Sequence, residues 1–348
     1  MNRLTSLLGT RWPLIQAPMA GVQDAGLAIA AGAAGALGSL PCAMLAPEAM
    51  QRELRRLADT GRPYNVNFFC HTPPQPDGAR EATWRTALAP YYAEIGQDVN
   101  AVPAGPGRLP FSDAAADVLE AFKPRVVSFH FGLPAPALLA RVKAWGAVVL
   151  SSATTVDEAL WLEAHGADAV IAQGLEAGGH RGHFLSHDLT LQTGTFALLP
   201  QIKAALRVPV IAAGGIADAA GVRAAMALGA DGVQVGTAYL CSDEATTSAL
   251  HRAALRSPAS RHTQLTTLFT GRPARGIPNR VMRELGALQN AAPAFPLATA
   301  AIAPLRAHWE KQGKGDFSPL WSGQNASGCR AAGAAAITQE LAKGFGPI

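Results

Sequence analysis

Short apolar runs alternate with longer amphipathic segments from Leu14 to Gly236. The clearest of these runs, Ala169–Ala172, is apolar at every position, which is typical of a strand buried on both faces. The segments between the runs are rich in Ala and Leu and have apolar positions at helical spacing. The predicted strands are Leu14–Pro18, Gly35–Ser39, Asn65–Cys70, Val126–Phe131, Ala147–Ser152, Ala169–Gln173, Pro209–Ala213 and Gly232–Gly236, and the predicted helices include Ala46–Thr60, Pro134–Trp145, Thr155–His165, Gln201–Leu206 and Ala219–Leu228.

This alternation of strands and helices predicts the fold class. About eight strand–helix units in roughly 240 residues have the size and rhythm of a (β/α)8 barrel, and a doubly wound sheet is the alternative. No G-x-G-x-x-G sequence follows the first strand, as a dinucleotide-binding sheet would favour. Gly-rich turns follow the last two strands instead. We therefore predict an α/β fold, a (β/α)8 TIM barrel with a smaller, mainly helical substrate domain.

Changes in composition suggest where this chain divides. The barrel is expected over residues 1–241, with a Pro-rich insertion at 75–111 over its top. Residues 242–318 lack further strand–helix units and are interrupted by Arg, Pro and Gly, so they predict a helical domain that covers the mouth. Residues 319–348 predict a turn and an Ala-rich helix that packs back on the barrel.

Composition excludes several classes of protein. With 348 residues, 49% of them hydrophobic and 16% charged, the chain has the composition of a folded protein. The net charge is +4, but Lys and Arg are scattered and form no basic stripe for nucleic acid. The apolar segment Ala25–Leu40 is too short to span a bilayer, and the N-terminus does not resemble a signal peptide, so we expect a cytoplasmic protein without membrane contact. The cysteines are far apart and predict neither a disulfide framework nor a zinc knot: Cys42, Cys70, Cys241 and Cys329.

The stretch Asp168–Phe184 is the strongest candidate for chemistry. Its buried strand ends at Gln173, and Gly178, Gly179 and His180 follow in the next loop. Ligands of barrels bind at the carboxyl ends of the strands, so these groups are expected at the mouth. An imidazole there exchanges a proton near neutral pH, which makes His180 the candidate base, with an ordinary loop histidine as the alternative.

The turns at Gly214–Gly215 and Gly236–Thr237 predict a phosphate site. Glycine has no Cβ, so its backbone N–H approaches a phosphate closely, and the N-terminus of a following helix adds a favourable dipole. Barrels commonly hold a phosphate at these two loops. Asp218 lies where the next helix should begin, and we expect it to cap that helix.

Three polar residues near strand ends have both a structural and a functional interpretation. Asn67 and Gln173 are either satisfied core amides or contacts to the polar edge of a ligand. His130 alone is more typical of a packed histidine than of a catalyst. His180, His183 and His187 also suggest a metal, but they share no helix face and no Cys or carboxylate pair supports them, so no metal site is predicted.

These residues belong to longer motifs that resemble the nitronate monooxygenase family, class I, formerly called 2-nitropropane dioxygenases. The EAGGH core alone is less specific, being shared with flavin-dependent enoyl-acyl-carrier-protein reductases and related quinone reductases. The motifs run almost the whole chain in order: IQAPMAG (15–21), NVNFF (65–69), SFHFG (128–132), QGLEAGGHRG (173–182), IAAGGIAD (211–218), GVQVGTAYL (232–240), GRPARGIPN (271–279) and PLWSGQ (319–324).

The resemblance implies a barrel that holds one non-covalent FMN. By the family pattern, Met19 and Ala20 would lie against the isoalloxazine ring, and the Gly-rich loops would hold the phosphate. The residues implied in FMN contact are Asn67, Gln173, Gly178, Gly215, Gln234, Val235, Gly236 and Thr237, beside which Gly179 and Gly214 belong to the same Gly-rich loops.

The implied reaction is the oxidation of an alkyl nitronate, or of a nitroalkane after deprotonation, by flavin and O₂ to a carbonyl compound and nitrite. His180 would be the base that removes the α-proton, and His130 would hydrogen-bond the nitro oxygens. A monomer or a homodimer is expected. An NAD(P)H-dependent flavin reductase acting on enoyl thioesters or quinones is the alternative, and a binding protein or metal hydrolase is a third possibility.

The sequence departs from the family pattern near its C-terminus. Family members usually place tyrosines and a lysine near the substrate there, whereas Leu285–Glu310 contains neither Tyr nor Lys. Phe295, Arg306 and His308 are the candidates in that region instead. The resemblance therefore does not fix the substrate pocket.

Overall fold

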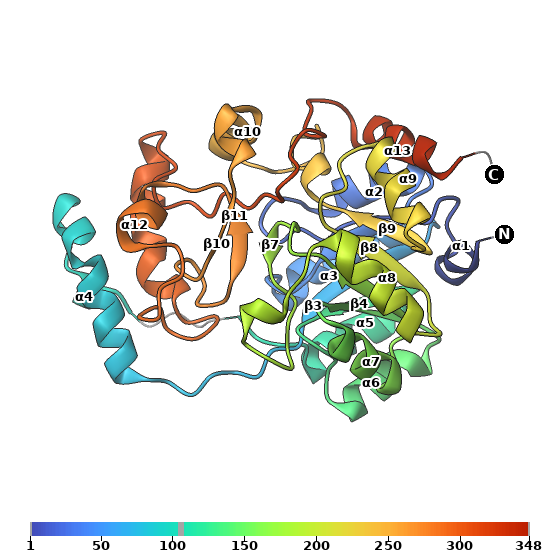
Figure 1. Ribbon diagram of the computed structural model, residues 1–348. Coiled ribbons are helices and arrows are strands. Elements are labelled where there is room, and N and C mark those ends of the chain that lie inside the picture. Colours follow the sequence, from blue (N-terminus) through green and yellow to red (C-terminus); the bar gives the residue numbers. More distant parts are fainter. Residues whose placement is uncertain (1, 104–107, 347–348) are drawn as a thin grey trace.

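The computed structural model describes residues 2–103 and 108–346, and eight parallel strands in these residues form a barrel (Figure 1). The strands are β1 (Leu14–Gln16), β2 (Gly38–Pro41), β3 (Tyr64–Phe69), β4 (Val126–His130), β5 (Val148–Ala153), β6 (Ala169–Gln173), β8 (Val210–Ala213) and β9 (Gly232–Val235). They lie side by side in the order β1, β9, β8, β6, β5, β4, β3, β2. The ring closes where Gln16 N donates to Leu37 O at 2.9 Å. The (β/α)8 barrel is thus confirmed, and the doubly wound sheet is excluded.

Helices surround the barrel because both faces of its strands are apolar. Val170 and Val210 pack outward against Leu199 and the other apolar side chains of the helices, whereas Ile171 and Ile211 point into the barrel. Continuous apolar runs satisfy both surfaces at once. The helices of this layer are α2 (Ala25–Ala33), α3 (Pro47–Ala58), α5 (Asp113–Phe122), α6 (Pro136–Ala144), α7 (Val156–Ala164), α8 (Thr195–Ala205), α9 (Ala219–Ala227) and the C-terminal α13 (Ala334–Ala342), which packs on α2 and α9.

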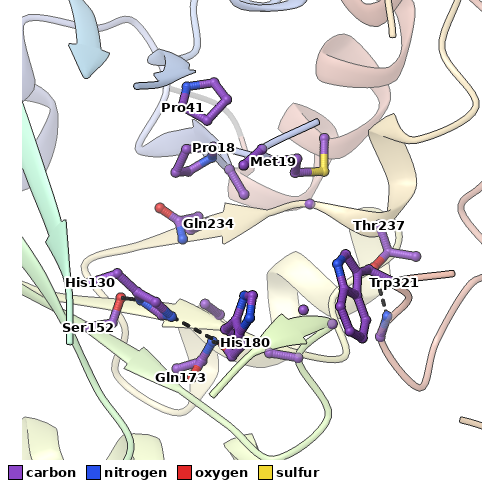
Figure 2. A pocket seen from close by; sticks show the side chains of 18 of the residues that line it. Pro18, Met19, Pro41, His130, Ser152, Gln173, His180, Gln234, Thr237 and Trp321 are labelled. Atoms are coloured by element: carbon purple, nitrogen blue, oxygen red, sulfur yellow. Dashed lines mark hydrogen bonds between the residues drawn. The ribbon is translucent and has the colours of Figure 1, made fainter. Parts of the chain in front are cut away.

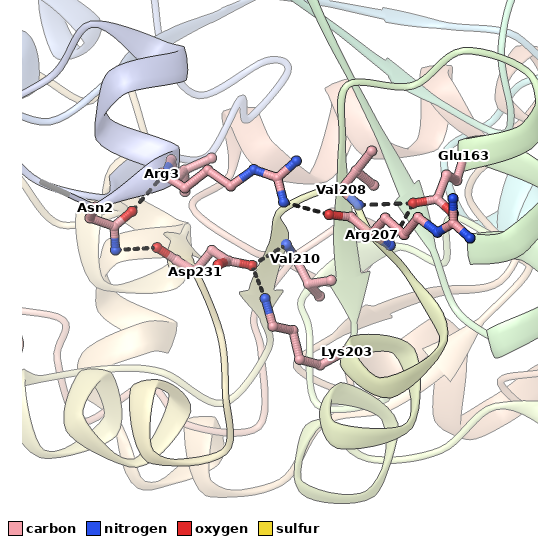
Figure 3. Close-up of polar contacts among 9 residues, drawn as sticks. Asn2, Arg3, Glu163, Lys203, Arg207, Val208, Val210 and Asp231 are labelled. Atoms are coloured by element: carbon pink, nitrogen blue, oxygen red, sulfur yellow. Dashed lines mark hydrogen bonds and ion pairs between the residues drawn. The ribbon is translucent and has the colours of Figure 1, made fainter.

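Helix α1 (Arg3–Leu8) closes the end of the barrel where the strands begin. Its Leu4 and Leu8 are fully buried among the inward side chains of the strands. Polar contacts fix the helix there (Figure 3): Asn2 Nδ2 donates to Asp231 O at 2.9 Å, and the Asp231 carboxylate accepts from Val210 N at 2.8 Å. The carboxyl ends of the strands are left as the end that is open to ligands.

A second hydrophobic core lies beside the barrel (Figure 1). It contains α4 (Gly78–Glu94), α11 (Arg280–Leu285) and α12 (Thr299–Lys311), and Tyr92 Oη of α4 donates to Ala301 O at 2.6 Å. Helix α10 (Ala249–Arg256) follows the last barrel strand in the sequence. In segment 75–111, helix α4 packs on α12 and Arg108 lies at the open end of the barrel; residues 104–107 lie outside the described residues.

A three-stranded antiparallel sheet joins the barrel to this second core. Its strands are β10 (Gln264–Thr266), β11 (Ala274–Gly276) and β7 (Gly179–His180), in the order β10, β11, β7. Strand β7 belongs to the loop after β6, and its His180 pairs with Ala274. The sheet therefore fixes the backbone of the candidate histidine. Within the described residues, no helix combines the length and the apolar content needed to cross a bilayer.

Candidate active site

A cavity of about 210 Å³ lies at the carboxyl ends of the strands. Pro18 and Met19 lie across it from His180 and Trp321 (Figure 2). The structure brings nearly every predicted site residue to its wall. These are Met19, Ala20, Asn67, His130, Gln173, Gly178, Gly179, His180, Gly214, Gly215, Gln234, Gly236 and Thr237.

Val235 is the predicted site residue whose side chain is not part of this wall. It is 1% exposed and packs between the sheet and the helices, because side chains alternate along β9 and the neighbouring Gln234 points to the cavity. Its carbonyl oxygen accepts from Ala17 N at 2.8 Å. Val235 therefore contributes to the core and to the strand that carries Gln234.

Two Gly-rich turns of the cavity wall carry main-chain N–H groups that suit an anion. Gly214 and Gly215 have φ values of +122° and +73°, which favour glycine, and among the described residues the N–H groups of Gly215 and Gly236 donate to no protein acceptor. Helix α9 begins just beyond the first pair, and its predicted N-cap is confirmed, since Asp218 Oδ1 accepts from Gly221 N at 2.8 Å. Such N–H groups beside a helix N-terminus bind a phosphate.

Two amides of the cavity wall have side-chain oxygen atoms without a partner among the described residues. Gln234 Oε1 is buried and has no hydrogen-bond partner within the described part of the chain. Asn67 Nδ2 donates to Ser128 Oγ at 2.9 Å, which leaves Asn67 Oδ1 without a partner among the described residues. A buried carbonyl oxygen without a donor costs free energy, so these amides fit a ligand that carries N–H groups.

His180 lines the same cavity and is surrounded by aromatic rings. Its ring lies 5.4 Å from the ring of Phe295, 5.8 Å from Trp321 and 6.1 Å from both Phe69 and Phe131. Burial lowers its pKa well below the usual value, and the positive charge of Arg108 and Arg272 lowers the pKa further. His180 is therefore a neutral imidazole at physiological pH.

His130 and Gln173 hold the backbone of His180 (Figure 2). His130 Nε2 lies 3.2 Å and Gln173 Nε2 lies 3.0 Å from the His180 carbonyl oxygen. His130 Nδ1 lies 3.0 Å from Ser152 Oγ, and Gln173 Oε1 accepts from Gly182 N at 2.7 Å. Burial lowers the pKa of His130 to about 3, so its ring is neutral. Both ring nitrogens of His130 already have partners in this structure.

The C-terminal segment completes the wall. Gly323 N donates to Thr237 Oγ1 at 3.0 Å, and Gln324 N donates to Glu176 O at 2.9 Å. A Cβ on Gly178 would lie 2.5 Å from Gly323 N, so glycine is required for this close approach. The WSGQ run is recognisable in the sequence, but its hydrogen bond to Thr237 joins two distant segments and could not be predicted from it.

Several residues around His180 were not predicted from the sequence. Thr270 Oγ1 lies 3.0 Å from His180 Nε2, and the guanidinium of Arg272 lies 3.9 Å from the ring centre of Phe131. Of the three C-terminal candidates, Phe295 reaches the site, whereas Arg306 pairs with Glu310 on α12 and His308 contacts Gln312 there. The sequence feature that could have indicated them is the GRPARGIPN run, which contains Arg272 and directly follows Thr270.

His183 is a buried histidine in the same loop as His180. It is 2% exposed, and both of its ring nitrogens lack a partner among the described residues. Burial, followed by the charge of Arg272, lowers the pKa of His183 to about 3. No group of three or more metal-ligating side chains occurs in residues 2–103 and 108–346.

We expect His183→Leu to weaken the pH dependence of stability. The pKa of His183 is lower in the folded protein than in the unfolded chain, so between about pH 6.5 and about pH 3 only the unfolded chain binds this proton. The free energy of unfolding therefore falls as pH falls, by up to ~1.4 kcal/mol per pH unit per such histidine. Urea unfolding at several pH values should show a smaller slope for His183→Leu. The exposed His187→Leu is the control, and an unchanged slope in both variants would contradict the assignment.

The fold and site together define a class: a (β/α)8 barrel with Gly-rich turns and a neutral histidine in one cavity at the carboxyl ends of its strands. A model of the family "Nitronate monooxygenase" matches residues 1–343. The chain belongs to the nitronate monooxygenase family and is an oxidoreductase.

Relatives and solved structures agree with this assignment. The chain is 42% identical over 346 residues to a nitronate monooxygenase of Pseudomonas aeruginosa, covering 98% of each chain, and 41% identical over 348 residues to one of Paraburkholderia phytofirmans, covering 97% and 93%. It is similar to the structure of nitroalkane oxidase from Streptomyces ansochromogenes, with TM-score 0.88, 39% identity and 98% of each chain covered. FabK from Thermotoga maritima is similar with TM-score 0.75 and 26% identity, covering 99% and 96%.

Proposed function

We propose that this protein binds FMN and oxidises alkyl nitronates, and neutral nitroalkanes after deprotonation, with O₂ to carbonyl compounds and nitrite. One observation carries the proposal: the N–H groups of Gly215 and Gly236, which have no protein acceptor among the described residues, share a cavity with the neutral ring of His180. The family and the neighbouring nitroalkane oxidase agree with this chemistry.

The residues present fit FMN. Gly214, Gly215, Gly236 and Thr237 would hold its phosphate, which needs several main-chain donors at one point. The side-chain oxygens of Gln234 and Asn67, which have no partner among the described residues, would suit the N–H and polar edge of an isoalloxazine ring. Met19 and Ala20 supply an apolar wall for its face. Bound FMN supplies the capacity to accept electrons from the substrate and pass them to O₂.

His180 would act on the proton of a neutral nitroalkane. A nitroalkane must lose an α-proton before oxidation, and a neutral imidazole in an enclosed site accepts that proton. A nitronate has already lost it and needs only to be bound. The guanidinium groups of Arg108 and Arg272 give this end of the cavity a positive potential, which favours a nitronate anion.

His130 would serve as a positioning residue. A hydrogen bond from His130 to a nitro oxygen, which the family resemblance implies, requires the contact with Ser152 or with the His180 carbonyl to break. Its pKa of about 3 rules out a cationic donor near neutral pH. Together with Gln173, His130 fixes the backbone from which the base projects.

Anaerobic stopped-flow absorbance tests the function. We expect the purified protein to be yellow, with FMN as the released flavin. Mixing with propionate-3-nitronate in the absence of O₂ should bleach the flavin band rapidly, whereas NADPH should not. Rapid bleaching by NADPH and none by the nitronate would instead select a flavin reductase, the function that the EAGGH core leaves open. A colourless protein that takes up no FMN would overturn both.

A further inference from the structure

Thr270 reaches the site from the segment between β10 and β11. Its hydroxyl lies 3.0 Å from His180 Nε2, and its side chain is 3% exposed. Among the described residues it is the hydrogen-bond partner of the His180 ring. The histidine comes from a barrel loop and its partner from the smaller core, so the ring orientation depends on both.

The turn that carries Thr270 is rigidly placed. Gly271 has φ of +85°, and a Cβ at this position would lie 1.9 Å from the carbonyl oxygen of Pro293. Gly271 N donates to Thr267 O at 2.7 Å. Because a tight turn and buried packing hold the hydroxyl in place, it sets the orientation of the imidazole ring.

The second nitrogen of the His180 ring faces the cavity. Nδ1 has no hydrogen-bond partner in the described residues. It is not one of the fully buried atoms, so it is accessible. His180 lines the cavity, so Nδ1 is the ring nitrogen that a ligand reaches. The function of this nitrogen depends on whether it carries the hydrogen of the neutral ring or the lone pair.

We propose that Thr270 is the positioning residue that keeps His180 in the tautomer with hydrogen on Nε2, so that Nδ1 presents its lone pair to the substrate. The Thr270 hydroxyl oxygen accepts from Nε2–H and, at 3.4 Å, from Arg272 N, and the hydroxyl donates its own hydrogen, also at 3.4 Å, to the Arg272 carbonyl oxygen. In the opposite tautomer the hydroxyl would donate to Nε2, and Nδ1–H would meet no protein acceptor among the described residues. With hydrogen on Nε2, both the Nε2–H group and the Thr270 hydroxyl hydrogen have an acceptor.

This inference rests on the proposed function and specifies its proton step. The α C–H bond of a nitroalkane breaks as Nδ1–H forms, and the C–H electron pair becomes the C=N bond of the nitronate, whose charge lies on the nitro oxygens. The ring becomes an imidazolium that keeps its Nε2–H bond to Thr270. The same hydrogen bond thus orients the base before transfer and stabilises the cation after it.

The test compares Thr270→Val with Thr270→Ser. Valine keeps the shape without the hydroxyl, whereas serine keeps the hydroxyl. We expect Thr270→Val to lower kcat/KM for nitroethane by ~10- to ~100-fold, by analogy with the loss of a partner that orients a metal-ligating histidine, and to leave ethylnitronate within about threefold. Thr270→Ser should restore most of the nitroethane activity. Equal losses on both substrates, or no rescue by serine, would overturn the role.

A spectroscopic measurement tests the tautomer without relying on turnover. In protein with ¹⁵N-labelled histidine, the His180 signals are identified by their loss in His180→Asn. Wild type should show hydrogen on Nε2, and Thr270→Val should lose that preference. Hydrogen on Nδ1 in wild type would refute the assignment even if nitronate is oxidised as proposed. Failure of the proposed function would instead appear as no turnover of ethylnitronate by wild type.

Discussion

Replacing His180 by Asn should lower kcat/KM for a neutral nitroalkane by about 10²- to 10⁴-fold, the usual contribution of a general base. Asparagine is of similar size and polar, but it does not accept a proton in this pH range. The corresponding nitronate has no α-proton to lose, so its oxidation should fall far less. Initial rates of O₂ uptake with nitroethane and with ethylnitronate, at matched flavin content, give the comparison.

The same loop offers a matched control for this substitution. His187 is exposed and lies outside the cavity, so His187→Asn should leave both rates unchanged. The low pKa of His180 adds a second expectation: the wild-type rate with nitroethane should not decline as pH falls from 8 through the ordinary histidine range near ~6.5. A nitronate rate reduced as much as the nitroalkane rate would show that His180 is not the base.

Much of the barrel was predictable because its strands are buried on both faces. The runs containing Val126, Val149 and Ile171 are mostly apolar, and the structure has strands β4, β5 and β6 there. Helix α8 shows where local patterns end. It was expected to follow Pro200 but begins at Thr195, because the distant Glu176 carboxylate accepts from Thr195 N at 2.8 and 2.9 Å. An N-cap supplied from another loop has no local signal.

The second core was less predictable because its contacts join distant segments. Trp84 and Tyr92 of α4 are buried against α12, more than two hundred residues along the chain, as the Tyr92–Ala301 hydrogen bond shows (|i−j| = 209). The short β7 is visible only through its pairing with β11. Nothing in the local sequence of Gly179–His180 predicts a strand, since glycine is unfavourable in one.

The site was predictable where backbone geometry determines chemistry. Glycines after two neighbouring strands indicate close approach to a ligand, and Gly214, Gly215 and Gly236 do line the cavity. Partners of side chains were not predictable. The engagement of both His130 nitrogens, and the burial of Arg181 with carbonyl and amide acceptors, depend on how three loops meet. Burial lowers the pKa of Arg181 to about 9, which no sequence pattern reveals.

Gly236→Val should reduce FMN binding at least ~10-fold while leaving the fold intact. Gly236 has φ of −114°, which any residue adopts, so the substitution adds no backbone strain. A Cβ there would lie 3.4 Å from Ala17 Cβ and 3.6 Å from Met19 Sδ, and the valine methyl groups would extend into the space beside the Gly236 N–H. A phosphate that needs that N–H would be kept away.

The measurements for this variant separate cofactor loss from misfolding. The ratio of flavin to protein absorbance after purification and the dissociation constant for added FMN report binding, while circular dichroism and thermal unfolding report the fold. Gly78→Val is the matched control, because a Cβ on Gly78 meets nothing within 4 Å and α4 lies away from the cavity. Full FMN content in Gly236→Val would show that the Gly236 N–H does not bind the phosphate. Loss confined to Gly236→Val would tie the cofactor to the loop after β9, since both proteins carry the same added side chain.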